Sequence, residues 1–189
     1  MLKHKIINHL KLQLNKGRFE HTLRVTEVAI DLAKSYKKPV DKVELAALMH
    51  DYAKCQKADD LKKIMITNNI STDLLEYNKE LWHGPVAAYI AETSFGIKDK
   101  DVLHAIRYHT TGRAHMSDIE MILFVADYIE PNRNFKEVKE IRAVAKKNLP
   151  YTAWLVVRNT IQYLLKKRAI IHPNTLEAYN DLTKQIGDM

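Results

Sequence analysis

The chain has 189 residues, of which 46% are hydrophobic and 28% charged, with only five glycines and five prolines. This composition excludes a disordered, collagen-like or low-complexity protein and is typical of one compact domain spanning residues 1–189. Lysine and arginine outnumber aspartate and glutamate by 30 to 23, a formal net charge of +7, which favours an anionic partner such as a nucleotide or RNA. The longest apolar run, Met121 to Ala126, is far shorter than the ~20 residues that span a bilayer. The N-terminus lacks the continuous apolar stretch of a secretory signal, so we expect a cytoplasmic protein that does not bind membranes.

Apolar residues recur at intervals of three and four along almost the whole chain, and the alternating pattern of a β-strand is missing. This periodicity predicts an all-α fold in one domain. The expected helices cover residues 2–14, 19–36, 41–54, 85–95, 100–109, 117–130, 136–149, 152–167 and 174–186. Residues 55–84 have a less regular pattern, with a turn expected at Asn68-Asn69 and Ser71 as a cap.

Capping residues, glycines and prolines indicate where the helices begin and end. Asn15-Lys16-Gly17 is typical of a helix stop, and Asp41 of an N-cap. Ser117 and Glu120 form a capping-box pattern. The remaining boundaries follow from Pro85 in a first helical turn, from Gly96 and Gly112 as stops, and from Pro131, Pro150 and Pro173 as separators.

Four of these helices each place an ionisable residue in register with the apolar stripe that should face the core. The residues are His21, His50 with the adjacent Asp51, His109 and Asp127. One inward histidine is most often a core residue bonded to a backbone carbonyl. Three inward histidines with two carboxylates are much harder to assign to packing, because a buried unpaired carboxylate costs several kcal/mol. A metal cation offsets that cost, so the pattern predicts a metal site.

The types of donor narrow the choice of metal and of chemistry. Cys55 is the only cysteine, so a thiolate cage and an internal disulfide are both excluded. Imidazole and carboxylate donors suit iron(II), manganese(II) or zinc(II). Two histidines and two carboxylates on an octahedral ion would leave positions open for water and a phosphate oxygen, which is the arrangement of a phosphohydrolase.

The ordered phrases FEHTLRV, LMHDYAK, LWHGPVAA, AIRYHTTG, ILFVADYIEPNR and IHPNTLEAYN carry a resemblance to a known family. With its series of histidines and the adjacent His-Asp pair, the chain resembles the HD superfamily of metal-dependent phosphohydrolases. More narrowly, it resembles the YqeK family of symmetrical diadenosine tetraphosphate hydrolases over residues 19–182. The resemblance implies a helical HD-domain bundle with a buried metal site, and cleavage of diadenosine tetraphosphate into two ADP.

The resemblance also implies roles for individual residues. The metal ligands would be His21, His50, Asp51 and Asp127, with iron as the expected metal and manganese or another divalent ion as the alternative. Asp51 and Lys54 would be catalytic, with Asp51 accepting the proton of the attacking water and Lys54 neutralising phosphate charge. The other expected substrate contacts are His21, His83, His109, Thr110, Asp127 and Arg133 near the phosphates, and Ile170, Ile171, His172, Pro173, Asn174, Thr175 and Asn180 around the nucleoside.

Several alternatives stay open from the sequence. His83 and His109 are alternative ligands for a second metal ion. The same site would also suit a nucleotidase acting on other nucleoside phosphates, or a non-catalytic nucleotide sensor associated with RNA or the ribosome. The chain has no RNA-binding motif, so specific nucleic-acid binding is not expected. The sequence leaves the formation of a homodimer open.

Overall fold

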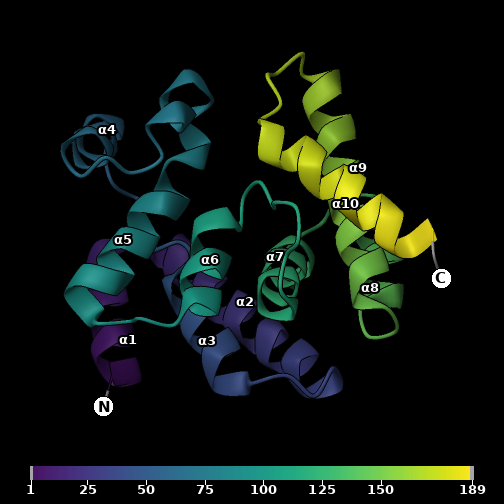
Figure 1. The fold of residues 1–189 in the computed structure, drawn as a ribbon. Coiled ribbons are helices and arrows are strands. Elements are labelled where there is room, and N and C mark those ends of the chain that lie inside the picture. Colours follow the sequence, from purple (N-terminus) through teal and green to yellow (C-terminus); the bar gives the residue numbers. More distant parts are fainter. Residues whose placement is uncertain (1, 188–189) are drawn as a thin grey trace.

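The computed structural model describes residues 2–187, and within this range all regular structure is helical, which confirms the all-α class (Figure 1). The α-helices are α1 (Leu2–Gln13), α2 (Lys16–Ser35), α3 (Val40–Met49), α4 (Ala58–Thr67), α5 (His83–Phe95), α6 (Lys100–Tyr108), α7 (Asp118–Ile129), α8 (Val138–Val144), α9 (Leu149–Lys166) and α10 (Pro173–Gly187). Two 3₁₀ helices, η1 (Thr72–Glu76) and η2 (Lys79–Leu81), lie between α4 and α5. Among the described helices, none combines the length and the apolar character needed to cross a membrane.

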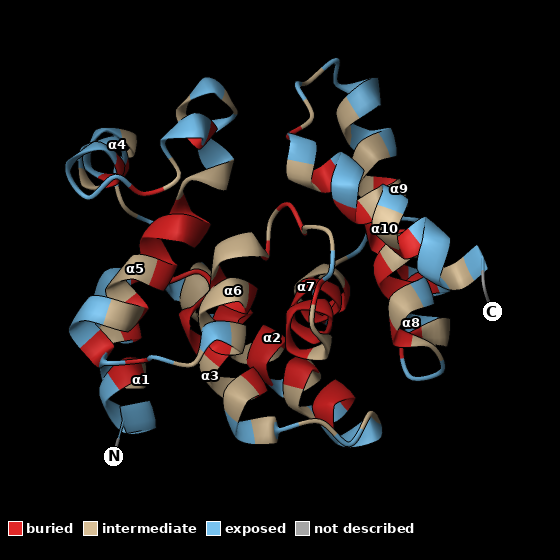
Figure 2. Cartoon of the chain, in the orientation of Figure 1, coloured by how far each residue is buried: buried red, intermediate tan, exposed pale blue. Residues whose placement is uncertain are grey.

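The core is built around α7, on which nine of 12 residues are buried. Helix α2 packs against α3 and α7, and α6 packs against α3 and α7 as well. Figure 2 shows the resulting buried zone, where these four helices face one another. The apolar stripes predicted from the sequence therefore meet in one core, and each of the four helices brings one polar residue to it.

Two flanking groups of helices rise from the same end of this core (Figure 1). One group contains α4 with η1 and η2, and the other is the packed pair α9 and α10. The ends of α2, α3, α6 and α7 that carry the inward polar residues lie between the two groups. Both groups therefore form walls around these polar residues.

Several predicted helix ends are confirmed. Ser117 and Glu120 form the expected capping box at the start of α7. Pro85 lies in the first turn of α5, and Gly96 ends that helix with a positive φ of 70°. Gly112 also has a positive φ, of 65°, and its N–H donates to the Tyr108 carbonyl at the end of α6.

Two capping predictions in the first part of the chain are wrong. Asn15 does not end the first helix but is the N-cap of α2, because its short side chain accepts a hydrogen bond from the Arg18 N–H at 2.9 Å. Gly17 then lies inside the first turn of α2. Asp41 is not a cap either, since α3 begins one residue earlier and Asp41 supplies negative charge to its first turn.

Four further predictions along the chain are wrong. The helix expected over 41–54 ends at Met49, and the region expected to be irregular contains α4. Ser71 does not cap with its side chain; it has a left-handed backbone before η1. The helix expected over 136–149 is only α8, because Asn148 caps α9 and Pro150 is accommodated in the first turn of α9.

Candidate metal centre

The inward polar residues predicted from the sequence come together at one place in the core. His21 lies in the second turn of α2, and Asp127 in the last turn of α7. His50 and His109 are the residues that directly follow α3 and α6. All three histidines and Asp51 are buried, with at most 6% of their surface exposed.

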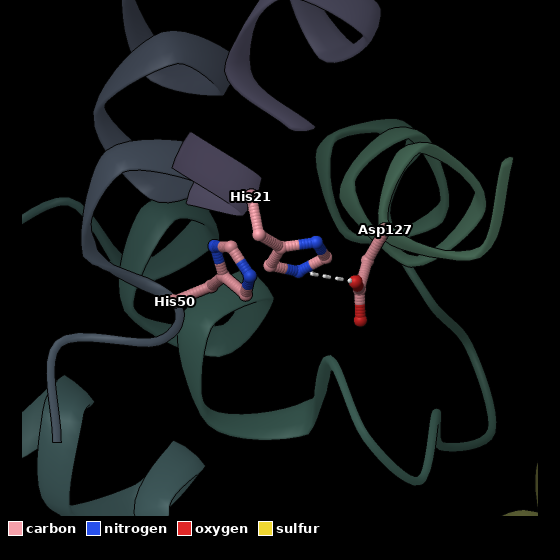
Figure 3. Close-up of side chains that lie close together, drawn as sticks. All are labelled: His21, His50 and Asp127. Carbon is pink, nitrogen blue, oxygen red and sulfur yellow. Dashed lines mark ion pairs between the residues drawn. The ribbon is translucent and has the colours of Figure 1, made fainter. Parts of the chain in front are cut away.

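Three of these side chains form a compact group of donors. Figure 3 shows His21, His50 and Asp127 turned towards a common point, with His21 Nε2 at 3.1 Å from Asp127 Oδ1. One ligand atom from each residue lies within 4.8 Å of the others. The Nε2 atoms of His21 and His50 are buried and make no hydrogen bond to the protein. Buried ring nitrogens without a partner, facing a carboxylate, are what a cation site requires.

Asp51 stands between this group and a second pair of histidines. Its Oδ2 lies 3.3 Å from His50 Nε2 and 3.6 Å from His21 Nε2. Its Oδ1 lies 3.1 Å from His83 Nε2 and 3.9 Å from His109 Nε2. The carboxylate thus presents one oxygen to each pair of imidazoles.

Backbone carbonyls fix the orientation of two of the rings. His50 Nδ1 lies 2.6 Å from the Ala47 carbonyl, and His109 Nδ1 lies 2.8 Å from the Ile106 carbonyl. A carbonyl only accepts hydrogen bonds, so Nδ1 carries the proton in both rings and Nε2 is left to face the site. The His83 and His109 Nε2 atoms are 3.0 Å apart, so a proton on His83 Nε2 would be shared between the bare His109 nitrogen and Asp51 Oδ1, which lies 3.1 Å from His83 Nε2.

The carboxylates of Asp51 and Asp127 are charged, and two of the imidazoles beside them, His83 and His109, are neutral. Burial lowers the pKa of His109 to about 3 and also lowers the pKa of His83, so both rings are neutral near pH 7. Burial alone would raise the pKa of Asp51, but His50 and His83 outweigh it and hold that pKa well below its usual value. The pKa of Asp127 is lowered in the same way, against burial, by His21, His50 and Arg133. At His50 burial acts to lower the pKa, but the Asp51 charge outweighs it and raises the pKa, so a metal ion would compete with a proton for this ring.

Glu130 is a buried carboxylate at this site that the sequence analysis did not identify. Its Oε1 lies 3.2 Å from His21 Nδ1, and its Oε2 accepts hydrogen bonds from Arg24 Nε at 2.7 Å and from the Asn132 N–H at 2.9 Å. A carboxylate on the far nitrogen of a metal-binding histidine fixes the ring and its tautomer. The sequence feature that could have identified Glu130 is its position three residues after Asp127, which is the spacing of residues on one face of a helix.

Gly84 permits the close approach of the two histidines in the second pair. A Cβ atom at this position would lie 2.8 Å from the Arg107 carbonyl oxygen and 3.5 Å from the His109 ring. The start of α5, which carries His83, therefore packs directly on the end of α6. A larger residue would force the two apart.

The two predicted cations at the rim lie beside carboxylates. Arg133 Nη2 is 2.9 Å from Asp127 Oδ1, and its Nε donates to the Asp127 carbonyl at 3.1 Å. Lys54 Nζ lies 2.9 Å from Glu80 Oε2. Arg133, Lys54 and Thr110 all line one large cavity that opens from the site.

The structure divides the predicted nucleoside-binding segment between a cavity and the surface. His172 and Asn174 line a cavity of about 200 Å³ that also borders Thr110. His172 is buried; its Nδ1 accepts a hydrogen bond from the Asn174 N–H at 3.1 Å, and its Nε2 has no hydrogen-bond partner. The other predicted positions are a buried Thr175, a partly exposed Ile171 and the exposed Ile170, Pro173 and Asn180.

Comparisons with known proteins agree with this geometry. The family model of the HD domain matches residues 18–132, a span that includes every member of the donor group. A relative from Halalkalibacterium halodurans named "Bis(5'-nucleosyl)-tetraphosphatase, symmetrical" is 45% identical over 96% of this chain and 97% of its own length. A relative of the same name from Bacillus subtilis is 42% identical, over 90% of this chain and 92% of its own.

The fold is also that of a solved structure. A crystal structure of a predicted HD superfamily hydrolase involved in NAD metabolism from Clostridium acetobutylicum superposes with a TM-score of 0.92 at 36% identity, covering 97% of each chain. A family match over more than half of the chain, together with relatives aligned over almost the whole of it, settles the family. This chain belongs to the HD-domain family, among the relatives named symmetrical bis(5'-nucleosyl)-tetraphosphatases.

Proposed function

We propose that this chain hydrolyses diadenosine tetraphosphate symmetrically into two ADP, with a divalent metal ion held by His21, His50, Asp51 and Asp127. One observation carries the proposal. Two buried ring nitrogens without hydrogen-bond partners converge with two carboxylates whose pKa values are held low. The relatives named for this reaction supply the choice of substrate.

Iron is the metal that we propose, with manganese or another divalent ion as the alternative. The donors are nitrogen and oxygen only, and this set fits first-row divalent metals. Such an ion, when bound, polarises a phosphoryl oxygen and makes water a better nucleophile at neutral pH. Cys55, the single cysteine, is exposed and forms no disulfide, which supports a cytoplasmic placement as part of this proposal.

Asp51 is the proton acceptor for the attacking water in this proposal. Its carboxylate is ionised at neutral pH, and Oδ1 faces His83 and His109 instead of the His21 side of the site. This oxygen therefore borders the space where a phosphate would sit. A base in that position takes the proton as the oxygen attacks phosphorus.

Other side chains bind and neutralise the phosphates. Arg133 supplies a guanidinium fork at the edge of the donor group, and Lys54 supplies a point charge on the wall of the same cavity. Neutral His83 and His109, with Thr110, supply hydrogen-bonding groups between them. These donors are already in position, so they would stabilise the negative charge that develops on the transferred phosphate.

The nucleoside of one half of the substrate is proposed to lie at His172, within the segment Ile170 to Thr175 and near Asn180. Because His172 Nδ1 is an acceptor, its Nε2 carries the proton, and this donor is buried beside the 200 Å³ cavity with Asp73 Oδ2 at 3.6 Å, beyond hydrogen-bond distance. A base nitrogen or carbonyl oxygen would satisfy it.

A second metal ion is a further candidate because of the second histidine pair. The His83 and His109 Nε2 atoms are 3.0 Å apart, and both face Asp51 Oδ1. His83, His109 and Asp51 would then hold the second ion, which would help to neutralise charge on the phosphates. Anaerobic metal analysis decides between the two roles of this histidine pair. One ion per chain would mean that His83 and His109 contact the phosphates, and two ions per chain would mean that they bind the second metal ion.

A panel of nucleotides tests the proposed reaction in the absence of RNA. We expect ADP as the only product from diadenosine tetraphosphate. AMP with ATP would contradict symmetrical cleavage, and faster turnover of nucleoside mono-, di- or triphosphates would make the chain a nucleotidase. Stoichiometric metal without turnover of any nucleotide would favour the sensor.

A further inference from the structure

The cavity that opens from the metal centre is much larger than the four predicted metal ligands require. It has a volume of about 690 Å³ and borders His109, Asp127 and Arg133 at one end. Small-molecule sites typically enclose ~300–1,000 Å³. The cavity runs from the metal centre along α9, a helix that carries none of the predicted site residues.

Part of the cavity lining is aromatic, and we define this aromatic pocket by Tyr128, Phe135, Val156, Asn159 and Tyr163. Tyr128 packs edge-to-face on Phe135, with ring centroids 4.8 Å apart. Phe135 is 37% exposed and Tyr163 is 59% exposed, although both are large aromatic residues. Exposed aromatic rings lining a cavity offer the faces on which nucleobases stack.

Polar groups in the pocket add a means of recognition. Asn159 is buried and its Oδ1 accepts a hydrogen bond from Arg158 Nε at 3.0 Å; its Nδ2 makes no hydrogen bond of good geometry, and the amide acts to lower the pKa of the neighbouring Tyr128 hydroxyl. Because the arginine can only donate, it fixes the amide with Nδ2 as the donor. A purine ring offers acceptor nitrogens of the kind that this donor lacks.

Cations connect the aromatic pocket to the metal centre. Arg133 lies between Asp127 and the pocket, while Lys166 and Lys54 line the same cavity. Glu80, Asp127 and Glu137 line the cavity as well, so the cations are individual contacts for phosphate oxygens and the lining as a whole has no excess of positive side chains.

We propose that the aromatic pocket binds the second nucleoside of the dinucleoside tetraphosphate. This inference rests on the proposed function. The smaller cavity at His172 and the large cavity share Leu81 and Thr110, and their other lining residues differ, so they are two neighbouring spaces that adjoin at these two residues. A nucleoside anchored in each fixes the register of the phosphate chain and places its central P–O bond at the metal centre. With one anchor, a chain of four similar phosphates slides and the cleavage loses its symmetry.

The test compares two substrates in the metal-loaded protein. Adenosine 5'-tetraphosphate has the same four-phosphate chain as diadenosine tetraphosphate but only one nucleoside. The variant combines Phe135→Ala with Tyr163→Ala. The matched control is Tyr151→Ala: Tyr151 lies on α9 like Tyr163 and is also exposed, but it does not line the cavity.

We expect the double variant to lose about 5–100-fold in kcat/KM on diadenosine tetraphosphate, mainly through KM, since base stacking on aromatic side chains is worth that much. On adenosine tetraphosphate the loss stays within about twofold, because its single nucleoside still has the His172 cavity. AMP and ATP appear among the products of the dinucleotide, and the control behaves as wild type. An equal loss on both substrates, or no loss on either, would overturn the proposal.

Equilibrium binding of diadenosine tetraphosphate to the metal-free protein separates this proposal from the proposed function. The double variant should bind it at least fivefold more weakly than wild type and Tyr151→Ala, whether or not the wild type turns it over. Equal binding by all three proteins overturns the pocket assignment. Binding that weakens as expected in a wild-type protein without hydrolysis would leave the pocket in place and reject the reaction.

Discussion

Replacing Glu130 by glutamine keeps the shape of the side chain and removes its charge. In the native site both carboxylate oxygens accept hydrogen bonds, from His21 Nδ1 on one side and from Arg24 Nε and the Asn132 N–H on the other. A glutamine has one acceptor oxygen, so its NH₂ group must face a donor on one of the two sides. His21 then loses the charged partner that fixes its ring.

The expected loss follows from these contacts. A hydrogen bond to a charged group contributes roughly 1.5–3 kcal/mol, and changing a partner behind a ligand histidine costs about 10–100-fold in metal affinity. We therefore expect Glu130→Gln to weaken metal binding by about 10–100-fold. The assay is titration of the metal-free protein with Mn²⁺ in competition with a chelator of known affinity.

Glu120→Gln is the matched control for this variant. Glu120 is a buried carboxylate at the other end of α7, and Arg113 donates to both of its oxygens at 2.7 Å. Both variants should lower the free energy of unfolding in urea by similar amounts, but only Glu130→Gln should lose metal affinity. Unchanged affinity in Glu130→Gln, or an equal fall in both variants, would refute the positioning role of Glu130.

Three further predictions concern the centre itself. Asp51→Ala should abolish stoichiometric metal binding and hydrolysis together, and retention of both would contradict the ligand set. Gly84→Ala should cost about 1–3 kcal/mol of stability in urea unfolding, because its Cβ would press on the Arg107 carbonyl; wild-type stability would show that α5 and α6 can separate freely. In the metal-free protein, burial lowers the pKa of His109 from 6.5 to about 3. The unfolded chain therefore takes up this proton first as the pH falls, and stability is lost from about pH 6.5 downwards. The free energy of unfolding should fall by roughly 3 kcal/mol by pH 4.5. His109→Gln should therefore make the free energy of unfolding in urea depend less on pH between 6.5 and 4.5. An unchanged dependence would mean that other groups cause the loss.

Helix register accounts for what the sequence could predict of the site. The direction of a side chain on a helix follows from its spacing to apolar residues, so this spacing alone was enough to place His21, His50 and Asp127 on the inner face. The order in which they meet could not be predicted, because it depends on how α2, α3 and α7 cross. The link from Asp51 to His83 is of this second kind, since it depends on the packing of α5 against α6.

Two parts of the fold were not predicted from the sequence, for different reasons. Helix α4 buries only Leu61 and Met65, but with Ile64 these residues have the i, i+3, i+4 spacing of a helix, so a periodic signal was present in that stretch and was missed. The end of α3 at Met49 was hidden because residues 50–53 stay buried after the helix stops, and their apolar pattern continues the stripe. Burial and helical structure usually go together, and here they separate at the metal centre.

The arrangement of α2 shows why a ligand could be identified more easily than the residues around it. Arg18, His21 and Arg24 are three residues apart and share one helix face. Arg18 Nη1 donates to Asp51 at 2.7 Å and Arg24 Nε to Glu130 at 2.7 Å, so each arginine holds a carboxylate that also approaches the His21 ring. An arginine on a helix resembles a solvated surface charge in sequence, and only its buried acidic partner reveals the role. One face of α2 therefore carries the proposed ligand His21 and the two arginines that position Glu130 and a second proposed ligand, Asp51. Substitution of either arginine should disturb the candidate metal centre, although neither arginine is itself a proposed ligand.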